Sequence, residues 1–282
     1  CPRARGSRER RRPLSSVVLR RFCDQCAAYR DPQETRRVGP ERSPMVVCGT
    51  CGDTLRTEEQ RVAQPLPRAL VRAHLYPFAP AIAVSIVVTG LVRAFAAYVP
   101  LIGALLSATI AIGFVFLVLH ASAEGRDDLA MDTEVAESAA DWFAPLIRYL
   151  LTWLVSFAAA GFALLLLGWP TGALPAAVLG ILGLVYFPAG IIVAAHGGGC
   201  LGPLNPVPGV QLIARIPGAY FMTLAFLVLT LALGYGVVAV AQRLFGGIPF
   251  LGPALVRVLG LVAPVIMARQ LGILVHEHRE LL

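Results

Sequence analysis

Residues 219 to 241 read AYFMTLAFLVLTLALGYGVVAVA, a run without one charged side chain. At 1.5 Å per helical residue the run is about 34 Å long, enough to cross the hydrocarbon core of a bilayer. Lipid offers no hydrogen-bond partner to backbone amides, and the period-two alternation of a barrel strand is nearly absent. The run therefore predicts a transmembrane helix.

Five more runs share this character, and the whole chain is 57% hydrophobic with only 15% charged residues, against about 25% in soluble proteins. Connections after the first, third and fifth runs are short and rich in Pro and Gly, whereas the other two are about 25 residues long. We expect an all-α membrane protein with six transmembrane helices in three hairpins over residues 77–282. The five other runs are Pro77 to Tyr98, Val99 to His120, Leu146 to Gly168, Ala173 to Ala195 and Ile248 to Val275.

Charge is divided unevenly along the chain. Residues 1–76 hold 16 Arg and 8 acidic residues, residues 77–282 hold 8 Arg and 9 acidic residues, and there is no Lys, so +8 and −1 give the net +7. Short segments rich in positive charge stay on the cytoplasmic side of a membrane. We therefore expect a multi-pass protein of a bacterial cytoplasmic membrane, with both termini in the cytoplasm.

Two cysteine pairs, Cys23-x2-Cys26 and Cys48-x2-Cys51, precede the apolar runs and are separated by 21 residues. Four thiolates complete the tetrahedral shell of a structural Zn²⁺ and leave no position for a catalytic water. We expect a zinc ribbon over residues 21–54. Two disulfides and a redox-active pair are the alternatives, but the predicted compartment is reducing and a redox pair needs a βαβ context.

The segments on either side of the predicted ribbon differ from it in composition. Residues 1–20 are rich in Arg and poor in apolar residues, which predicts a disordered basic leader that contacts anionic lipid or RNA or only sets topology. Residues 55–76 predict an amphipathic connector broken by Pro65 and Pro67. A module this small suits protein docking, and nucleic acid is a weaker prediction because aromatic and basic residues do not form a reading surface.

The apolar runs contain few of the residue types that catalysis or proton transfer requires. No Asp or Glu lies within any apolar run, which argues against a proton-driven transporter. His196-Gly197-Gly198-Gly199 matches an esterase oxyanion loop, but the Gly-x-Ser-x-Gly nucleophile turn is absent from the sequence. We expect a protein that is not an enzyme.

Two arginines, Arg93 and Arg257, fall inside apolar runs near their predicted outer ends. An ionised side chain at the bilayer centre costs about 2.5 to 3.5 kcal/mol or more. The two side chains either extend to the headgroups or contact an anion or substrate.

Histidines recur at the predicted cytoplasmic ends of the even-numbered runs. His120, His196 and His276, with Cys200, form a possible second metal site or a pH-responsive gate, because imidazole and thiolate are transition-metal ligands. The alternative is that His is favoured electrostatically at the carboxyl end of a helix.

Two further patterns concern packing and repetition. Val99-Pro100-Leu101-Ile102-Gly103 resembles Ile248-Pro249-Phe250-Leu251-Gly252, although five residues do not establish a duplication. Within the last long connection, Val210 to Ile216 predicts a short amphipathic turn at the headgroups.

The segments FCDQC, VCGTCGDTL, YFPAG (Tyr186 to Gly190) and GPLNPV (Gly202 to Val207) resemble bacterial zinc-ribbon membrane proteins and, distantly, the Yip family of multi-span proteins. This resemblance implies membrane organisation or partner recruitment and no catalytic residue. We expect the zinc ribbon to recruit or sense a cytosolic protein; the alternative is a small-solute transporter or channel regulated by the ribbon. A solute path needs a polar cavity between the spans, whereas a scaffold is close-packed through small residues such as Ala177, Gly180 and Gly183.

Overall fold

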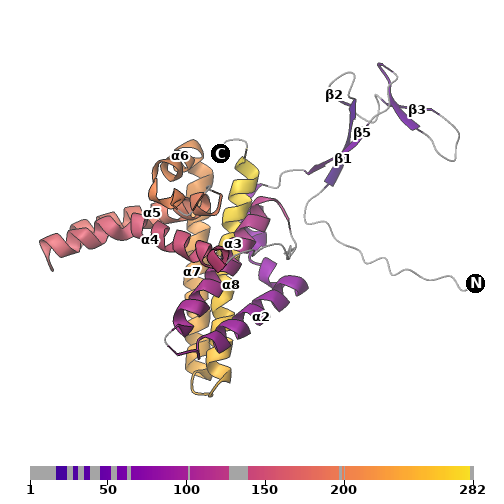
Figure 1. Ribbon diagram of the computed structural model, residues 1–282. Helices are drawn as coiled ribbons and strands as arrows, with labels where there is room; N and C mark the ends of the chain where they lie inside the picture. The colour runs from indigo at the N-terminus through magenta and orange to yellow at the C-terminus, as the bar shows by residue number, and fades with distance from the viewer. Residues whose placement is uncertain are drawn as a thin grey trace, which may run out of the picture. The chain divides into compact units, whose positions relative to one another are not determined.

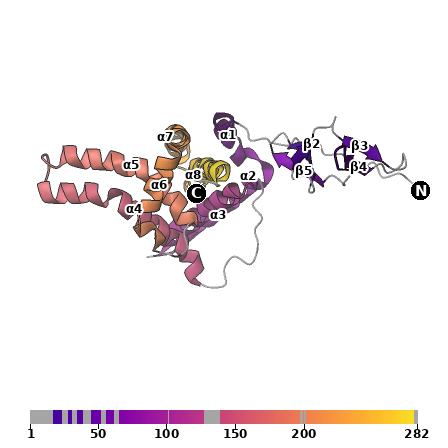
Figure 2. The same cartoon turned by 90° about the horizontal axis from the view of Figure 1, so that it is seen from above.

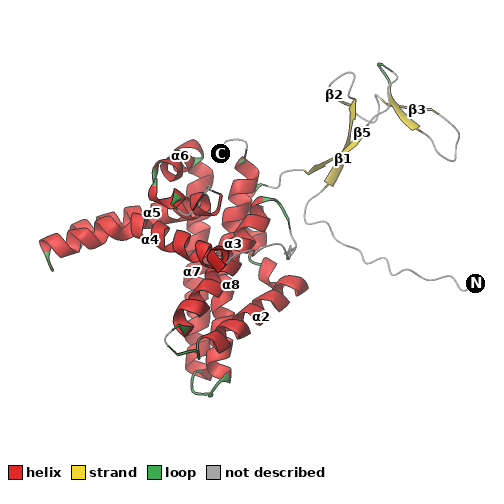
Figure 3. Ribbon diagram, in the orientation of Figure 1, coloured by secondary structure: helices red, strands yellow, loops and turns green. Residues whose placement is uncertain are grey.

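The computed structural model describes residues 17–23, 28–30, 35–38, 45–51, 56–61, 65–100, 102–126, 139–196, 199 and 201–279. The chain divides into two compact units, residues 1–65 and 66–282. In the described residues, strands occur only in the first unit and helices only in the second (Figure 3).

The first unit contains two antiparallel sheets. One has the strand order β2-β1-β5 and the other pairs β3 with β4. The strands are β1 (Val17–Cys23), β2 (Ala28–Arg30), β3 (Thr35–Val38), β4 (Met45–Cys48) and β5 (Arg56–Arg61).

The strands shift the boundaries predicted for this unit. Val17 to Arg20 belong to β1 rather than to the leader, and they pair with β5, which lies in the predicted connector. Adjacent β-branched Val17 and Val18 favour extended backbone. Their partners in β5 are remote in the sequence, in the register Val17↔Arg61 and Val18↔Gln60, so a local pattern does not show the pairing. The Arg-rich composition around Val17 and Val18 therefore favoured a prediction of disorder where the structure has a strand.

The second unit is helical, and each of the six apolar runs forms a helix. Five helices are long and apolar enough to cross a membrane, namely α3, α4 from Phe143, α5, α7 and α8, whereas α2 has 17 residues. The helices are α1 (Leu66–Ala73), η2 (Tyr76–Phe78), α2 (Pro80–Ala96), α3 (Gly103–Ala123), α4 (Ala139–Leu167), α5 (Ala173–His196), η3 (Gly202–Leu204), α6 (Val207–Arg215), α7 (Pro217–Phe245) and α8 (Leu251–His278).

The first apolar run is shorter as a helix than the sequence predicts. Tyr76–Phe78 forms a 3-10 turn, Pro80 occupies the first turn of α2, and the chain leaves the helix after Ala96 for the tight turn into α3. Proline suits a helix start because its missing N–H has no partner there. The same rule corrects the connector, because Pro67 lies in the first turn of α1 and does not break it.

Three pairs, α2–α3, α4–α5 and α7–α8, are antiparallel hairpins, as predicted (Figure 1). α8 packs against α2, α3 and α7 and is the most buried of the five long helices. The α4–α5 hairpin projects away from the other helices in both views (Figures 1 and 2). The last long connection contains α6, so the predicted amphipathic element is a helix.

The two similar pentapeptides form the same turn. Ile102 N–H donates to Pro100 O at 2.8 Å, and Leu251 N–H donates to Pro249 O at 2.7 Å. In the next residue of each turn, Gly103 N–H donates to Val99 O and Gly252 N–H donates to Ile248 O. The rings of Tyr98 and Phe250 lie 6.0 Å apart, so the tips of α2–α3 and α7–α8 touch.

Buried polar groups near the middle of α8 are satisfied inside the chain. Gln270, fully buried, donates to Thr230 Oγ1 of α7 at 3.2 Å. The His74 Nε2, just after α1, lies 3.1 Å from the same hydroxyl. This network ties α1, α7 and α8 together where no water is available.

A hydroxyl group interrupts the hydrogen-bond ladder of α5. The Tyr220 hydroxyl of α7 donates to Val185 O at 2.5 Å and accepts from the Ala189 N–H at 3.2 Å, a pair that would otherwise bond to each other. Pro188, inside α5, supplies no N–H of its own. Tyr220 therefore bridges the opening that a helix needs around an internal proline.

Close helix packing depends on particular glycines. A Cβ on Gly183 of α5 would collide with the backbone oxygen of Ser156 in α4, and one on Gly90 would lie 2.7 Å from the Cα of Val258 in α8. Of the three small residues expected to mediate packing, Gly183 does so, Gly180 has nothing within 4 Å of a Cβ, and Ala177 is exposed.

Replacing Tyr220 by Phe should lower the free energy of unfolding by about 1 to 3 kcal/mol, because two buried backbone groups lose their partner. Unfolding in detergent micelles measures the change. Tyr235→Phe, on an exposed position of the same helix, is the matched control. Equal stability of both variants would contradict the bridge.

Gly183→Ala should destabilise the α4–α5 hairpin by about 1 to 3 kcal/mol through overpacking. Gly180→Ala, one turn away, should be neutral or stabilising by up to about 1 kcal/mol, because Ala is the better helix former. Thermal unfolding of the two variants side by side tests the contact. The opposite order of stability would exclude close packing at Gly183.

Candidate functional site

Each cysteine pair begins where a strand ends. Cys23 is the last residue of β1, in register with Ala28 of β2, so the first pair occupies the connection between these strands. Cys48 ends β4 and is 1% exposed, and exposed Cys51 lies in the turn that follows. Two cysteines on a tight turn after a strand present both sulfurs to one point.

The complete cysteine set is not in the described part of the chain, since Cys26 lies outside it, as does Cys200. Among described residues there is no group of three or more His, Cys, Asp or Glu side chains arranged to hold a metal ion. The first unit therefore contributes Cys48 and Cys51 as the two ligand candidates with described side chains.

Two of the predicted second-site residues come together. The rings of His120 and His196, in the last turns of α3 and α5, stack with centroids 5.3 Å apart. His276, at the end of α8, instead places its Nδ1 3.1 Å from Ala123 O. The histidines are thus at one end of the helical unit, and the described residues form a pair rather than a ring.

Arg93 and Arg257, from α2 and α8, are neighbours near the touching hairpin tips. Arg93 Nε donates to Ser107 O at 3.1 Å, and its Nη1 lies 3.5 Å from Arg257 O. Arg257 Nη1 lies 3.5 Å from Pro253 O in its own helix. In the described residues these contacts are all to main-chain carbonyls, and Arg93 reaches the main chain of Arg257.

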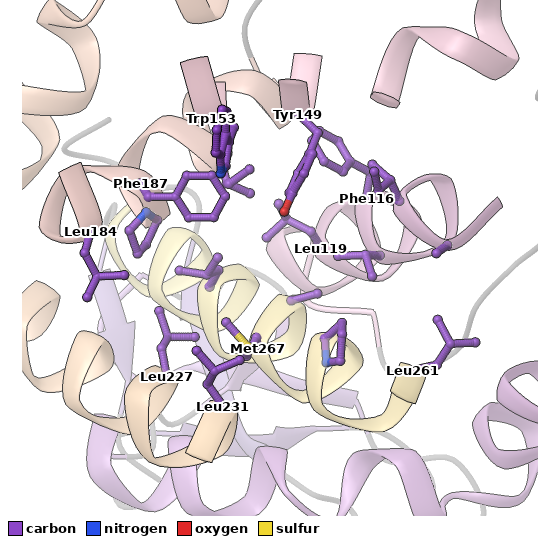
Figure 4. Close-up of a pocket in the computed structure, with 18 of the residues that line it drawn as sticks. Phe116, Leu119, Tyr149, Trp153, Leu184, Phe187, Leu227, Leu231, Leu261 and Met267 are labelled. Carbon is purple, nitrogen blue, oxygen red and sulfur yellow. The ribbon is translucent and has the colours of Figure 1, made fainter. Parts of the chain in front are cut away.

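An apolar cavity of about 490 Å³ lies among α3, α4, α5, α7 and α8, with Arg93 of α2 on its wall (Figure 4). Tyr149 and Trp153 of α4 stand on one side of it, across from Leu227 and Leu231 of α7. The volume falls in the range of small-molecule sites, about 300 to 1,000 Å³.

Sequence reasoning missed this cavity. Its aromatic wall comes from α4 and α5, where Tyr149 and Phe187 meet edge to face at 5.8 Å and Phe157 lies 5.9 Å from Phe187. The local signals were Pro188 and Pro264 within apolar runs, because a proline inside a helix favours a bend. Which helices face each other around these prolines is not encoded locally.

Five helices able to cross a membrane give the chain the architecture of a multi-pass membrane protein. No protein-family model matches the chain, and neither a curated protein nor a solved structure matches it. Its function is therefore argued from the two units themselves.

Proposed function

We propose that this protein is a non-enzymatic integral protein of a bacterial cytoplasmic membrane whose zinc ribbon recruits or senses a cytosolic partner. The observation that carries the proposal is the division of the chain into a β-stranded unit with paired cysteines and a helical unit with membrane-length spans. Such a division separates a small water-facing module from its anchor.

The donor set of the first unit suits zinc. Cys23, Cys26, Cys48 and Cys51 would supply four soft ligands, and the described ends of β1 and β4 at Cys23 and Cys48 are compatible with such a site. Strands of 3 to 7 residues make a small module, and a module of this size needs a metal or another crosslink to be stable, which favours a structural zinc ion. A module held in this way presents a rigid surface to a partner.

The helical unit favours anchoring over solute transport. The described residues that line the cavity are mostly aliphatic or aromatic, and among their side chains only those of Arg93, Tyr149 and Trp153 carry a nitrogen or oxygen atom. A channel or transporter for a small polar solute, the alternative function, needs hydrogen-bonding groups along its path. Close packing at Gly90 and Gly183 supports the role of a scaffold.

The full-length protein should contain about one zinc ion per chain, and Cys48→Ser should lose it, because three thiolates and a water bind zinc far more weakly. Elemental analysis of purified protein measures the metal. Cys200→Ser is the matched cysteine control and should keep the zinc. The triple change of His120, His196 and His276 to Gln should also keep it. Zinc lost with the histidines but kept in Cys48→Ser would place the metal at the other end of the chain.

Affinity capture from native membranes should recover a cytosolic protein with the wild-type chain and not with Cys23→Ser. The reason is that the partner surface needs the metal-folded module. Cys200→Ser, which leaves the module intact, should recover the same companion. An identical set of captured proteins from Cys23→Ser and wild type would contradict recruitment by the ribbon.

A further inference from the structure

The cavity opens sideways. Four of its lining residues, Trp153, Leu184, Val228 and Leu231, are each between 48% and 54% exposed. They belong to α4, α5 and α7. In a membrane, side chains exposed at mid-helix contact hydrocarbon, so the mouth faces the lipid.

The floor of the cavity is inaccessible. Leu119, Leu227 and Leu261 are no more than 3% exposed. Along α8 the lining runs from Gly260 to Leu271, about 16 Å at the rise of a helix. The space is therefore long, apolar and closed on its inner side, which is the shape of a site for a hydrocarbon chain.

One end of this space carries positive charge. Arg93 lines the cavity and Arg257 lies beside it, and in the described residues both bond only to main-chain oxygens. A guanidinium has five N–H donors, of which the described contacts use two in Arg93. Like charges held near hydrocarbon repel each other, and an anion between them removes that cost.

We propose that the cavity binds one acyl chain of an anionic phospholipid whose phosphate is held by Arg93 and Arg257. Guanidinium groups bind phosphate through paired N–H donors, and the apolar trough continues from that point into the bundle. The side opening admits a lipid from the bilayer without passage through water. A free phosphate ion would use the arginines and leave the adjoining apolar space without an occupant.

This lipid site is independent of the proposed function, because none of its residues lies in the cysteine unit. It also gives the helical unit a chemical preference among membranes. A protein anchored through a bound anionic lipid is stabilised where that lipid is present.

Gly260 makes a sharp test possible. A Cβ there meets nothing within 4 Å, and the residue lines the cavity, so Gly260→Leu places a side chain in the trough. Gly236→Leu is the matched control, because Gly236 of α7 is equally unobstructed and lies outside the cavity lining. Arg93→Gln removes the charge, and Arg93→Lys keeps it.

The full chain and each variant are placed in nanodiscs of phosphatidylcholine containing phosphatidylglycerol, and the lipid retained after transfer to detergent is counted by native mass spectrometry. We expect about one phosphatidylglycerol per wild-type chain, as for a single pocket. Gly236→Leu should retain it and Gly260→Leu should not. Arg93→Gln should bind it about tenfold more weakly, the loss expected for a hydrogen bond between charged groups, and Arg93→Lys less so.

Three results would overturn the proposal. The first is equal lipid retention by the two leucine variants, which would show that the acyl chain does not occupy the cavity. The second is an unchanged affinity of Arg93→Gln for phosphatidylglycerol, which would show that Arg93 does not contact the headgroup. The third is an unfolding temperature raised as much by inorganic phosphate as by phosphatidylglycerol, which identifies a site for free anions. The glycine variants test the acyl-chain site and the arginine variants test the headgroup contact, so a folding defect in one set leaves the other test decisive.

Discussion

The helical unit depends on satisfying polar groups where water is absent. α8 shows how this is done: Gln270 is fully buried and bonded to Thr230, and Arg269 of the same helix donates to Arg126 O at 2.7 Å and lies over the ring of Tyr76. An unpaired polar group in such surroundings costs several kcal/mol. These contacts therefore fix which faces of α1, α3 and α7 meet the central helix, while apolar contacts alone would allow many rotations.

The same constraint acts on α5 where this helix lines the cavity. An internal proline leaves a carbonyl without its usual donor, and in this chain the Tyr220 hydroxyl enters the opened ladder between Val185 and Ala189. Phe187 and Pro188, inside that segment, line the cavity. A hydrogen bond made by α7 thus sets the position of the wall that α5 contributes.

The sequence predicted what depends on composition and on short-range spacing. Long apolar runs require helices, so the existence and pairing of the six helices followed from residues such as 219–241. The length of α2 did not follow, because hydropathy does not register that Pro80 and the turn after Ala96 delimit a helix inside an apolar segment. β1 was missed at Val17 for a related reason: its pairing with β5 is remote in sequence. The turn shared by Val99–Gly103 and Ile248–Gly252 was visible in the sequence, and its identical hydrogen bonds give the repetition a structural basis.

That shared turn also accounts for the charge at one end of the cavity. The α2–α3 and α7–α8 hairpins bring equivalent tips together, with Tyr98 against Phe250, and this contact sets Arg93 beside the start of α8, where Arg257 lies. The α4–α5 hairpin has a different turn, around Pro170, and packs on the pair from the side. The two matching hairpins pack face to face through small residues such as Gly90, against Val258, and Gly272, against Ser122. The third hairpin does not share this turn, and the cavity lies where its aromatic side chains meet α3, α7 and α8. The walls of the cavity are apolar because each is built from a helix of an apolar run.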